Sequence, residues 1–149
     1  MAIARQYPYN SFNFQVKFGS TELAFQEVTG LNLEVHVAEY RNGNRKDLAP
    51  VKVTGMYKVD NVSFKRGVCG DLASLYARVD SVRKGNGNSP TGGETVTINL
   101  MDDSNETVVQ SWILTNARAT KISGPSYNGK ATDVAIEELV VMAEGITQA

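Results

Sequence analysis

The chain has 149 residues, 42% of them hydrophobic, and a formal net charge of −1. This length and composition support one sizeable core, so we expect a single domain over residues 1–149. A chain so close to neutral lacks the positive field of a general nucleic-acid binder. No stretch approaches the ~20 consecutive apolar residues of a membrane-spanning helix, and the first residues lack the apolar core of a signal peptide. We therefore expect synthesis in the cytoplasm and no membrane span.

The first half of the chain has the alternation that is typical of β-strands. Apolar residues occupy every second position from Phe12 to Phe18, and again from Leu31 to Val37. A polar stretch over residues 40–47 interrupts the pattern, which resumes from Val51 to Val59. These strands predict a long hairpin whose extended arm covers about residues 40–56, and Gly55 indicates a bulge or a close backbone contact.

After a short strand at 61–65, the spacing of apolar residues over 71–84 is typical of a helix. Asp71 follows Gly70 as an N-terminal cap, and basic residues occupy the last turn before Gly85. The buried stripe is predicted to be Leu72, Leu75, Tyr76, Val79 and Val82. The outer face is predicted to be Ser74, Arg78, Ser81 and Arg83. A Gly- and Asn-rich linker within the domain then runs to residue 93.

The second half of the chain returns to strands. We expect strands at residues 95–100, 108–114 and 117–122, with a turn at 102–105. Residues 134–142 fit both a helix and a strand, and their β-branched content favours a strand with a bulge near Glu137-Glu138. Trp112 is expected to anchor a core or subunit contact. The sequence thus predicts a mainly β fold with one helix.

The residues that carry chemistry in enzymes are sparse. Cys69 and His36 are the only cysteine and histidine, so a multi-histidine metal site is excluded. The stretch 124–131 is close to a phosphate-binding loop, but Ala131 stands where a magnesium-binding hydroxyl is needed and Pro125 removes a backbone donor. The acidic stretch 102–106 lacks the spacing of a calcium loop. Both stretches are interpreted as turns, and the sequence predicts neither an enzyme nor a cofactor.

Charge is distributed unevenly along the chain. Residues 41–58 contain five basic residues and one acid, whereas residues 133–144 contain four acids and no base. The simplest interpretation is two solvated faces that never meet. If the hairpin extends beyond the domain, the opposite charges could instead join one copy to the next.

Several short motifs resemble, in their order and spacing, a known family of structural proteins. In the first half these are Tyr7-Pro8-Tyr9, Phe12-Asn13-Phe14-Gln15-Val16, Phe25-Gln26-Glu27-Val28-Thr29-Gly30-Leu31, Glu39-Tyr40-Arg41 and Lys65-Arg66-Gly67-Val68-Cys69-Gly70-Asp71-Leu72. In the second half they are Trp112, Leu114-Thr115-Asn116-Ala117, Ser123-Gly124-Pro125 and Val134-Ala135-Ile136-Glu137 running to Glu144-Gly145. The chain resembles the tail-tube proteins of contractile phages and the inner-tube subunits of phage-tail-like contractile injection systems.

The resemblance implies a β-barrel or two-sheet sandwich with one helix packed alongside. It implies hexameric rings that stack into a hollow tube inside a contractile sheath, with baseplate and tube-terminating proteins at its ends and DNA or an effector protein in its lumen. Such a subunit would be made in the bacterial cytoplasm and become part of a phage tail or injection particle, which can become extracellular. The helix would lie away from the lumen.

In this interpretation the hairpin is an assembly arm that reaches an adjacent subunit or ring. The residues expected at its tip are Tyr40, Arg41, Asn42, Gly43, Asn44, Arg45 and Lys46. The possible acidic partners are Glu137, Glu138 and Glu144. One alternative is a secreted ring of the haemolysin-coregulated type from a type VI secretion apparatus, and another is a small β-barrel that binds a phosphorylated ligand through residues 124–131.

Overall fold

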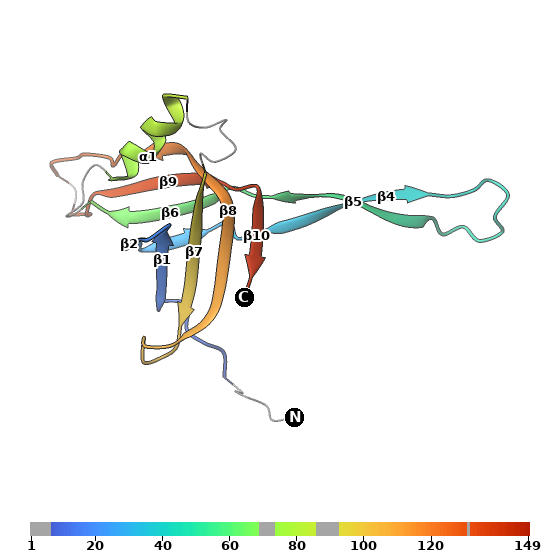
Figure 1. Ribbon diagram of the computed structural model, residues 1–149, viewed down its shortest axis with the longest axis horizontal. Helices are drawn as coiled ribbons and strands as arrows, with labels where there is room; N and C mark the ends of the chain where they lie inside the picture. The colour runs from blue at the N-terminus through green and yellow to red at the C-terminus, as the bar shows by residue number, and fades with distance from the viewer. Residues whose placement is uncertain (1–6, 69–73, 86–92, 131) are drawn as a thin grey trace.

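The computed structural model describes residues 7–68, 74–85, 93–130 and 132–149. It consists of a body of β-strands with one described helix, and a long two-stranded arm that projects from the body (Figure 1). The strands are β1 Phe14–Phe18, β2 Thr21–Leu23, β3 Glu27–Thr29, β4 Leu33–Tyr40, β5 Val51–Val59, β6 Val62–Gly67, β7 Glu94–Met101, β8 Val108–Ser123, β9 Ile136–Met142 and β10 Gly145–Gln148, and the helix is α1 Ser74–Arg83.

Strand β8 joins two sets of strands in the body. Its first half pairs with β7 and β10, and β7 continues through β1 to β2. Its second half pairs with β9, which continues through β6 to β3. All these pairs are antiparallel, and the two sets of strands run in crossing directions (Figure 1). The mainly β fold with one helix is confirmed, and the path of described strands is open at β2 and β3.

The sequence pattern had divided β8 into two strands, which is wrong. The chain continues as one strand of 16 residues, but the register against β7 shifts between Glu94 and Val96. Asn116 lies there with a positive φ of 52°, a conformation that asparagine tolerates better than most residues. This irregularity breaks the alternation, and it is where the strand passes from one set of partners to the other.

The core lies between the two sets of strands and α1. Leu75 of the helix is fully buried, as are Phe64 of β6 and Leu114 of β8. The rings of Phe18, Phe25 and Phe64 form a cluster with centroids 5.1 to 6.0 Å apart. Within the described ranges, the buried apolar residues are Val16, Phe18, Leu23, Val62, Phe64, Leu75, Val96, Ile98, Leu114, Ala117, Ala119, Leu139 and Val141.

The last long strand is also more regular than expected. Residues 134–142, whose sequence fits both a helix and a strand, contain strand β9. This strand pairs with β6 without interruption through Glu137 and Glu138. The predicted bulge at those residues is therefore wrong. The register shift lies on the neighbouring strand instead, between Ala119 and Lys121.

Candidate assembly interface

The arm is a two-stranded antiparallel ribbon of β4 and β5, closed by a distal loop of residues 41–50. It is longer than the predicted 40–56, because strand pairing begins at Leu33 and Val59. Every residue from Leu33 to Lys58 is exposed. A ribbon that contributes so little to the core of its own body keeps its shape through its own hydrogen bonds, and its side chains remain available to another molecule.

The predicted irregularity at Gly55 is confirmed. Val35 is aligned with Tyr57 and Val37 with Thr54, so His36 alone lies opposite Gly55 and Met56. This is a β-bulge, which increases the local twist of a ribbon. It lies near the middle of the arm.

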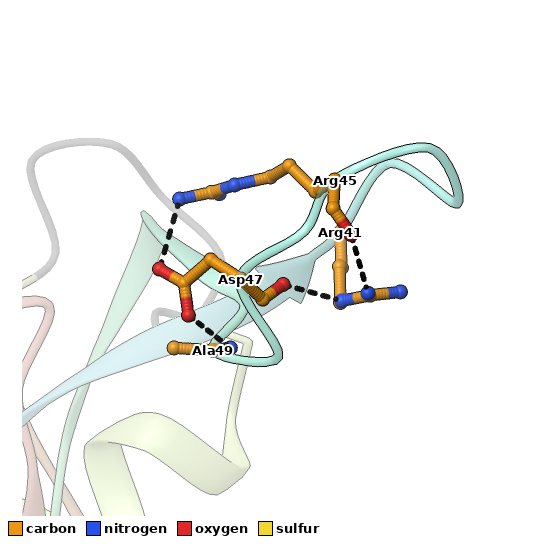
Figure 2. Close-up of polar contacts among 4 residues, drawn as sticks. All are labelled: Arg41, Arg45, Asp47 and Ala49. Carbon is orange, nitrogen blue, oxygen red and sulfur yellow. Dashed lines mark hydrogen bonds and ion pairs between the residues drawn. The ribbon is translucent and has the colours of Figure 1, made fainter.

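Side chains within the distal loop hold its shape, as Figure 2 shows. Arg41 donates from Nε to the carbonyl of Asp47 at 3.0 Å and from Nη2 to the carbonyl of Arg45 at 2.9 Å. Asp47 accepts the backbone N–H of Ala49 at 3.0 Å and forms an ion pair with Arg45 at 3.6 Å. The loop is therefore preorganised by the guanidinium and the carboxylate at its ends.

These contacts divide the predicted assembly residues at the end of the arm into two groups. Arg41 and Arg45 are engaged within the loop, and the hydroxyl of Tyr40 donates to the amide oxygen of Asn42. Lys46 is exposed, and none of the ion pairs among the described residues involves it. Gly43 has no atom within 4 Å of the position a Cβ would take, and Asn44 is exposed. Lys46 is thus the basic side chain best placed to meet a partner.

The prediction that Glu137 is an acidic assembly partner needs correction. Its side chain is only 8% exposed and accepts a hydrogen bond from Nε of Arg66 at 2.7 Å, so it joins β9 to β6 inside the body. Glu138 is half-buried and accepts a hydrogen bond from the hydroxyl of Ser63. Glu144 is 66% exposed and lies 3.5 Å from the buried guanidinium of Arg118. Of the three predicted acidic partners, Glu144 is the one that presents a carboxylate to solvent.

A groove at the base of the arm contains residues that the sequence analysis did not single out. Leu33, Val35 and Tyr57 of the arm face Thr115 and the segment 144–147 across this groove. Strand β10 forms its far wall, and β10 pairs with β8 along one edge and with no other described strand. The alternation of valines along these strands is visible in the sequence, but nothing in it shows that the valines are exposed or that the arm lies beside β10.

A second hollow lies on the body. It is lined by Phe12, Phe14, Leu31, Leu100 and Trp112 among others. Trp112 is half-buried and packs against the core, as one of its two predicted roles requires.

Comparison with known proteins identifies the family to which this projecting hairpin and its β body belong. The family model for the T4-like virus tail tube protein gp19 matches residues 10–147. The chain belongs to this family of tail tube proteins. No curated protein sequence matched the chain.

Solved structures of contractile injection system complexes contain chains with the same fold over almost the whole of this chain. A chain in the PVC sheath-tube complex, an extracellular contractile injection system in the extended state, is 25% identical, with a TM-score of 0.84 over 97% of this chain and 93% of that one. A chain in the PVC sheath/tube terminator is 25% identical, with a TM-score of 0.85 over 98% and 99%. The anti-feeding prophage cap shares the fold at 23% identity, with a TM-score of 0.86 over 100% and 95%.

Proteins of the type VI alternative are more distant. Hcp1 from Flavobacterium johnsoniae is 11% identical, with a TM-score of 0.55 over 93% of this chain and 95% of that one. This likeness shows a related fold alone. The tail tube family is therefore the assignment that the comparisons favour.

The outer face of α1 in this tail tube protein differs in part from the prediction. Ser81 and Arg83 are exposed, but Ser74 is half-buried near Arg66. Arg78 turns inward, where it forms an ion pair with Glu94 and its guanidinium lies 4.7 Å from the centre of the Phe18 ring. Tyr76, predicted to be buried, is 51% exposed, and Asp71 and Leu72 lie outside the described residues.

Charged side chains stabilise the end of α1. Hydrogen bonds from Lys84 and Arg83 hold the pKa of Asp80 below its usual value, and the same contacts raise the pKa values of both bases. Asp80 is therefore paired with both bases that follow it in the last turn of the helix.

The stretch that resembles a phosphate-binding loop connects two strands, β8 and β9. A phosphate-binding loop of that kind leads from a strand into a helix, whose N-terminus faces the phosphate. Here the backbone N–H of Lys130 instead donates to the side-chain oxygen of Asn128 at 3.0 Å. Residue 131 lies outside the described residues. The interpretation as a turn fits this geometry, and the family consists of structural tube proteins.

Proposed function

We propose that this tail tube protein is the inner-tube subunit of a contractile phage tail or a phage-tail-like contractile injection system. In this proposal the subunits form hexameric rings that stack into a hollow conduit enclosed by a contractile sheath. The similar chains come from a sheath-tube complex, a sheath/tube terminator and a tube-terminating cap, and an 18% identical chain comes from a baseplate. Sheath, baseplate and terminator proteins are accordingly the proposed partners.

The proposal rests mainly on two strand edges, those of β2 and β10, which lie at opposite ends of the same set of strands. The order β2-β1-β7-β8 ends at β2, and β10 lies on the other side of β8. Unpaired strand edges tend to pair with another chain. Two different edges on one subunit produce head-to-tail contacts, which close into a ring when the rotation between neighbours allows it. Pairing of β10 with β2 of the next copy would build such a ring and leave the arm free to reach a neighbour.

Particles of this kind deliver DNA or an effector protein through the lumen, and we assign this chain the same passive role as the wall of the conduit. The similar PVC chains belong to an extracellular particle. Among the described residues, no helix has the length and apolar character needed to cross a lipid bilayer.

Electron microscopy of the purified protein and of a variant lacking residues 42–46 tests the proposal. The wild-type protein should form rings or tubes. The deletion removes the middle of the distal loop and leaves the body intact, so the variant should remain folded but fail to form long tubes. A wild-type protein that stays monomeric at all concentrations would contradict the tube function, and normal tubes from the variant would contradict the role of the loop.

A further inference from the structure

A cavity of about 60 Å³ lies beneath α1, the helix at the top of the body in Figure 1. Residues of α1, β1, β7, β8 and β9 line it, so the cavity separates the helix from both sets of strands. Phe18, Val96 and Val141 form the apolar part of its wall. A cavity needs only about 10–15 Å³ to hold one water. This cavity therefore has room for a small ion together with a water.

The wall of this cavity has an excess of positive charge. Among the described residues, the charged ones that line it are Arg78, Arg118 and Glu94, which leaves one positive charge in excess. The side chains of Arg118 and Arg78 are only 7% and 19% exposed, and burying charge is costly unless a counter-charge lies close. Glu144 pairs with Arg118 at 3.5 Å, but its side chain is 66% exposed, so water and salt screen this pair.

The guanidinium of Arg78 is held in place but keeps one donor unused. It lies 4.7 Å from the centre of the Phe18 ring, and its Nη1 donates to the carboxylate of Glu94. Its Nε is shielded from solvent and has no hydrogen-bond partner among the described residues. Leaving a buried donor of a charged group unpaired is costly. An acceptor inside the cavity removes that cost, and an acceptor with a negative charge also balances the wall.

We propose that this cavity binds one small inorganic anion of single charge, such as chloride. The anion accepts a hydrogen bond from Nε of Arg78, and the buried guanidinium of Arg118 supplies the second positive charge of the site. A single negative charge neutralises the excess in the wall, whereas a doubly charged anion such as sulfate reverses it. Arg78 belongs to α1 and Arg118 to β8, so the bound anion links the helix to the strand that joins the two halves of the body.

Thermal unfolding in two sodium salts tests the proposal, with the protein kept below the concentration at which it assembles. Sodium chloride and sodium gluconate screen charges equally at the same ionic strength, but gluconate is too large for the cavity. A site that is half filled at about 10 mM chloride raises the ratio of folded to unfolded protein about tenfold at about 100 mM. We therefore expect a melting temperature about 4 °C higher in chloride than in gluconate.

Variants of single residues connect this difference to the cavity. Arg78→Met keeps an unbranched side chain near Phe18 but removes the donor and the charge, so its melting temperatures in the two salts should be equal. Arg83→Met is the matched control on the same helix, because Arg83 is 67% exposed and lies outside the cavity wall; it should keep the full difference. Glu94→Gln breaks the same ion pair as Arg78→Met but increases the positive charge of the wall, so it should enlarge the difference.

Bromide locates the ion within the structure. It has the same charge as chloride and a similar size, and it scatters X-rays anomalously. Crystals grown in sodium bromide should show an anomalous peak in the cavity, within hydrogen-bonding distance of Nε of Arg78. Crystals of Arg78→Met grown in the same salt should lack this peak.

The results that would overturn the proposal are distinct from one another. Equal melting temperatures of the wild type in the two salts would mean that no specific anion stabilises the fold. A difference that persists in Arg78→Met would place the anion elsewhere, and water without bromide in the cavity would show that a neutral acceptor satisfies Arg78. None of these measurements depends on tube formation, so the anion site and the proposed function are tested separately.

Discussion

The buried ion pair between Arg66 and Glu137 offers a quantitative test of how the body is held together. The two residues are directly opposite on β6 and β9, their side chains are 7% and 8% exposed, and Nε lies 2.7 Å from Oε1. Removing one partner leaves a charge that water cannot reach, which typically costs about 3–5 kcal/mol. Domains of this size are stable by about 5–15 kcal/mol in total, so Glu137→Ala should remove a large share of the free energy of unfolding.

Urea unfolding measured by circular dichroism, below the concentration at which the protein assembles, provides the assay. With a urea dependence of roughly 2 kcal/mol per molar, the expected loss shifts the midpoint of unfolding by about 2 M. The exposed pair between Lys65 and Glu27, 3.9 Å apart with side chains 39% and 52% exposed, is the matched control, and Glu27→Gln should change stability by less than about 1 kcal/mol.

The double variant Arg66→Met/Glu137→Leu separates the cost of an unpaired charge from the value of the pair. Apolar replacements of similar volume avoid the desolvation cost of both charges, so the double variant should recover most of the stability that the single variant loses. A shift in midpoint of less than about 0.5 M for Glu137→Ala would refute the argument that the carboxylate is buried and paired.

Three further predictions follow from individual residues. Gly30 has a φ of 93° and its added Cβ would collide with the Asn61 carbonyl oxygen, so Gly30→Ala should lower the free energy of unfolding by about 2 kcal/mol or more in urea titrations; an unchanged midpoint would contradict this. The backbone N–H of Glu106, then the Ser104 hydroxyl and the Thr107 N–H, hold the pKa of Asp102 below its usual 3.8, so Asp102 stabilises the fold above that pH and loses its contribution as the pH falls below it. Melting temperatures should therefore fall more steeply between pH 5 and pH 2 for the wild type than for Asp102→Asn, and parallel curves would count against this. Lys46→Glu should weaken assembly most at low salt, with Lys46→Gln as the control for charge loss, and equal assembly of both variants at all salt concentrations would show that the lysine is merely solvated.

Much of the fold could be predicted from alternation along the chain. The strand patterns near Phe12–Phe18 and Val51–Val59, the turn after β7, and the bulge at Gly55 all reflect local chemistry that a sequence carries directly. The predictions of local structure are wrong where contacts between distant parts of the chain determine the backbone conformation. Asn116 adopts a positive φ because the chain must pass between two sets of strands, and no local pattern distinguishes that from a turn.

The site residues show the same limit. The sequence correctly placed a polar, basic loop at the end of a hairpin, but charge counting could not show that Arg41 and Asp47 are engaged within that loop. It likewise treated Glu137 as a surface acid, because its buried partner Arg66 is 71 residues away in the sequence. Arg78 was assigned outward by helical spacing, yet its long side chain reaches back to Glu94 and Phe18.

A three-dimensional reconstruction of the assembled protein by cryo-electron microscopy is the measurement that tests the central claim most directly. The account predicts stacked hexameric rings around an open lumen, with α1 on the outside of the tube and the arm of each subunit reaching an adjacent subunit or ring. A reconstruction that shows a closed globular oligomer without a lumen, or filaments that lack a ring repeat, would contradict it.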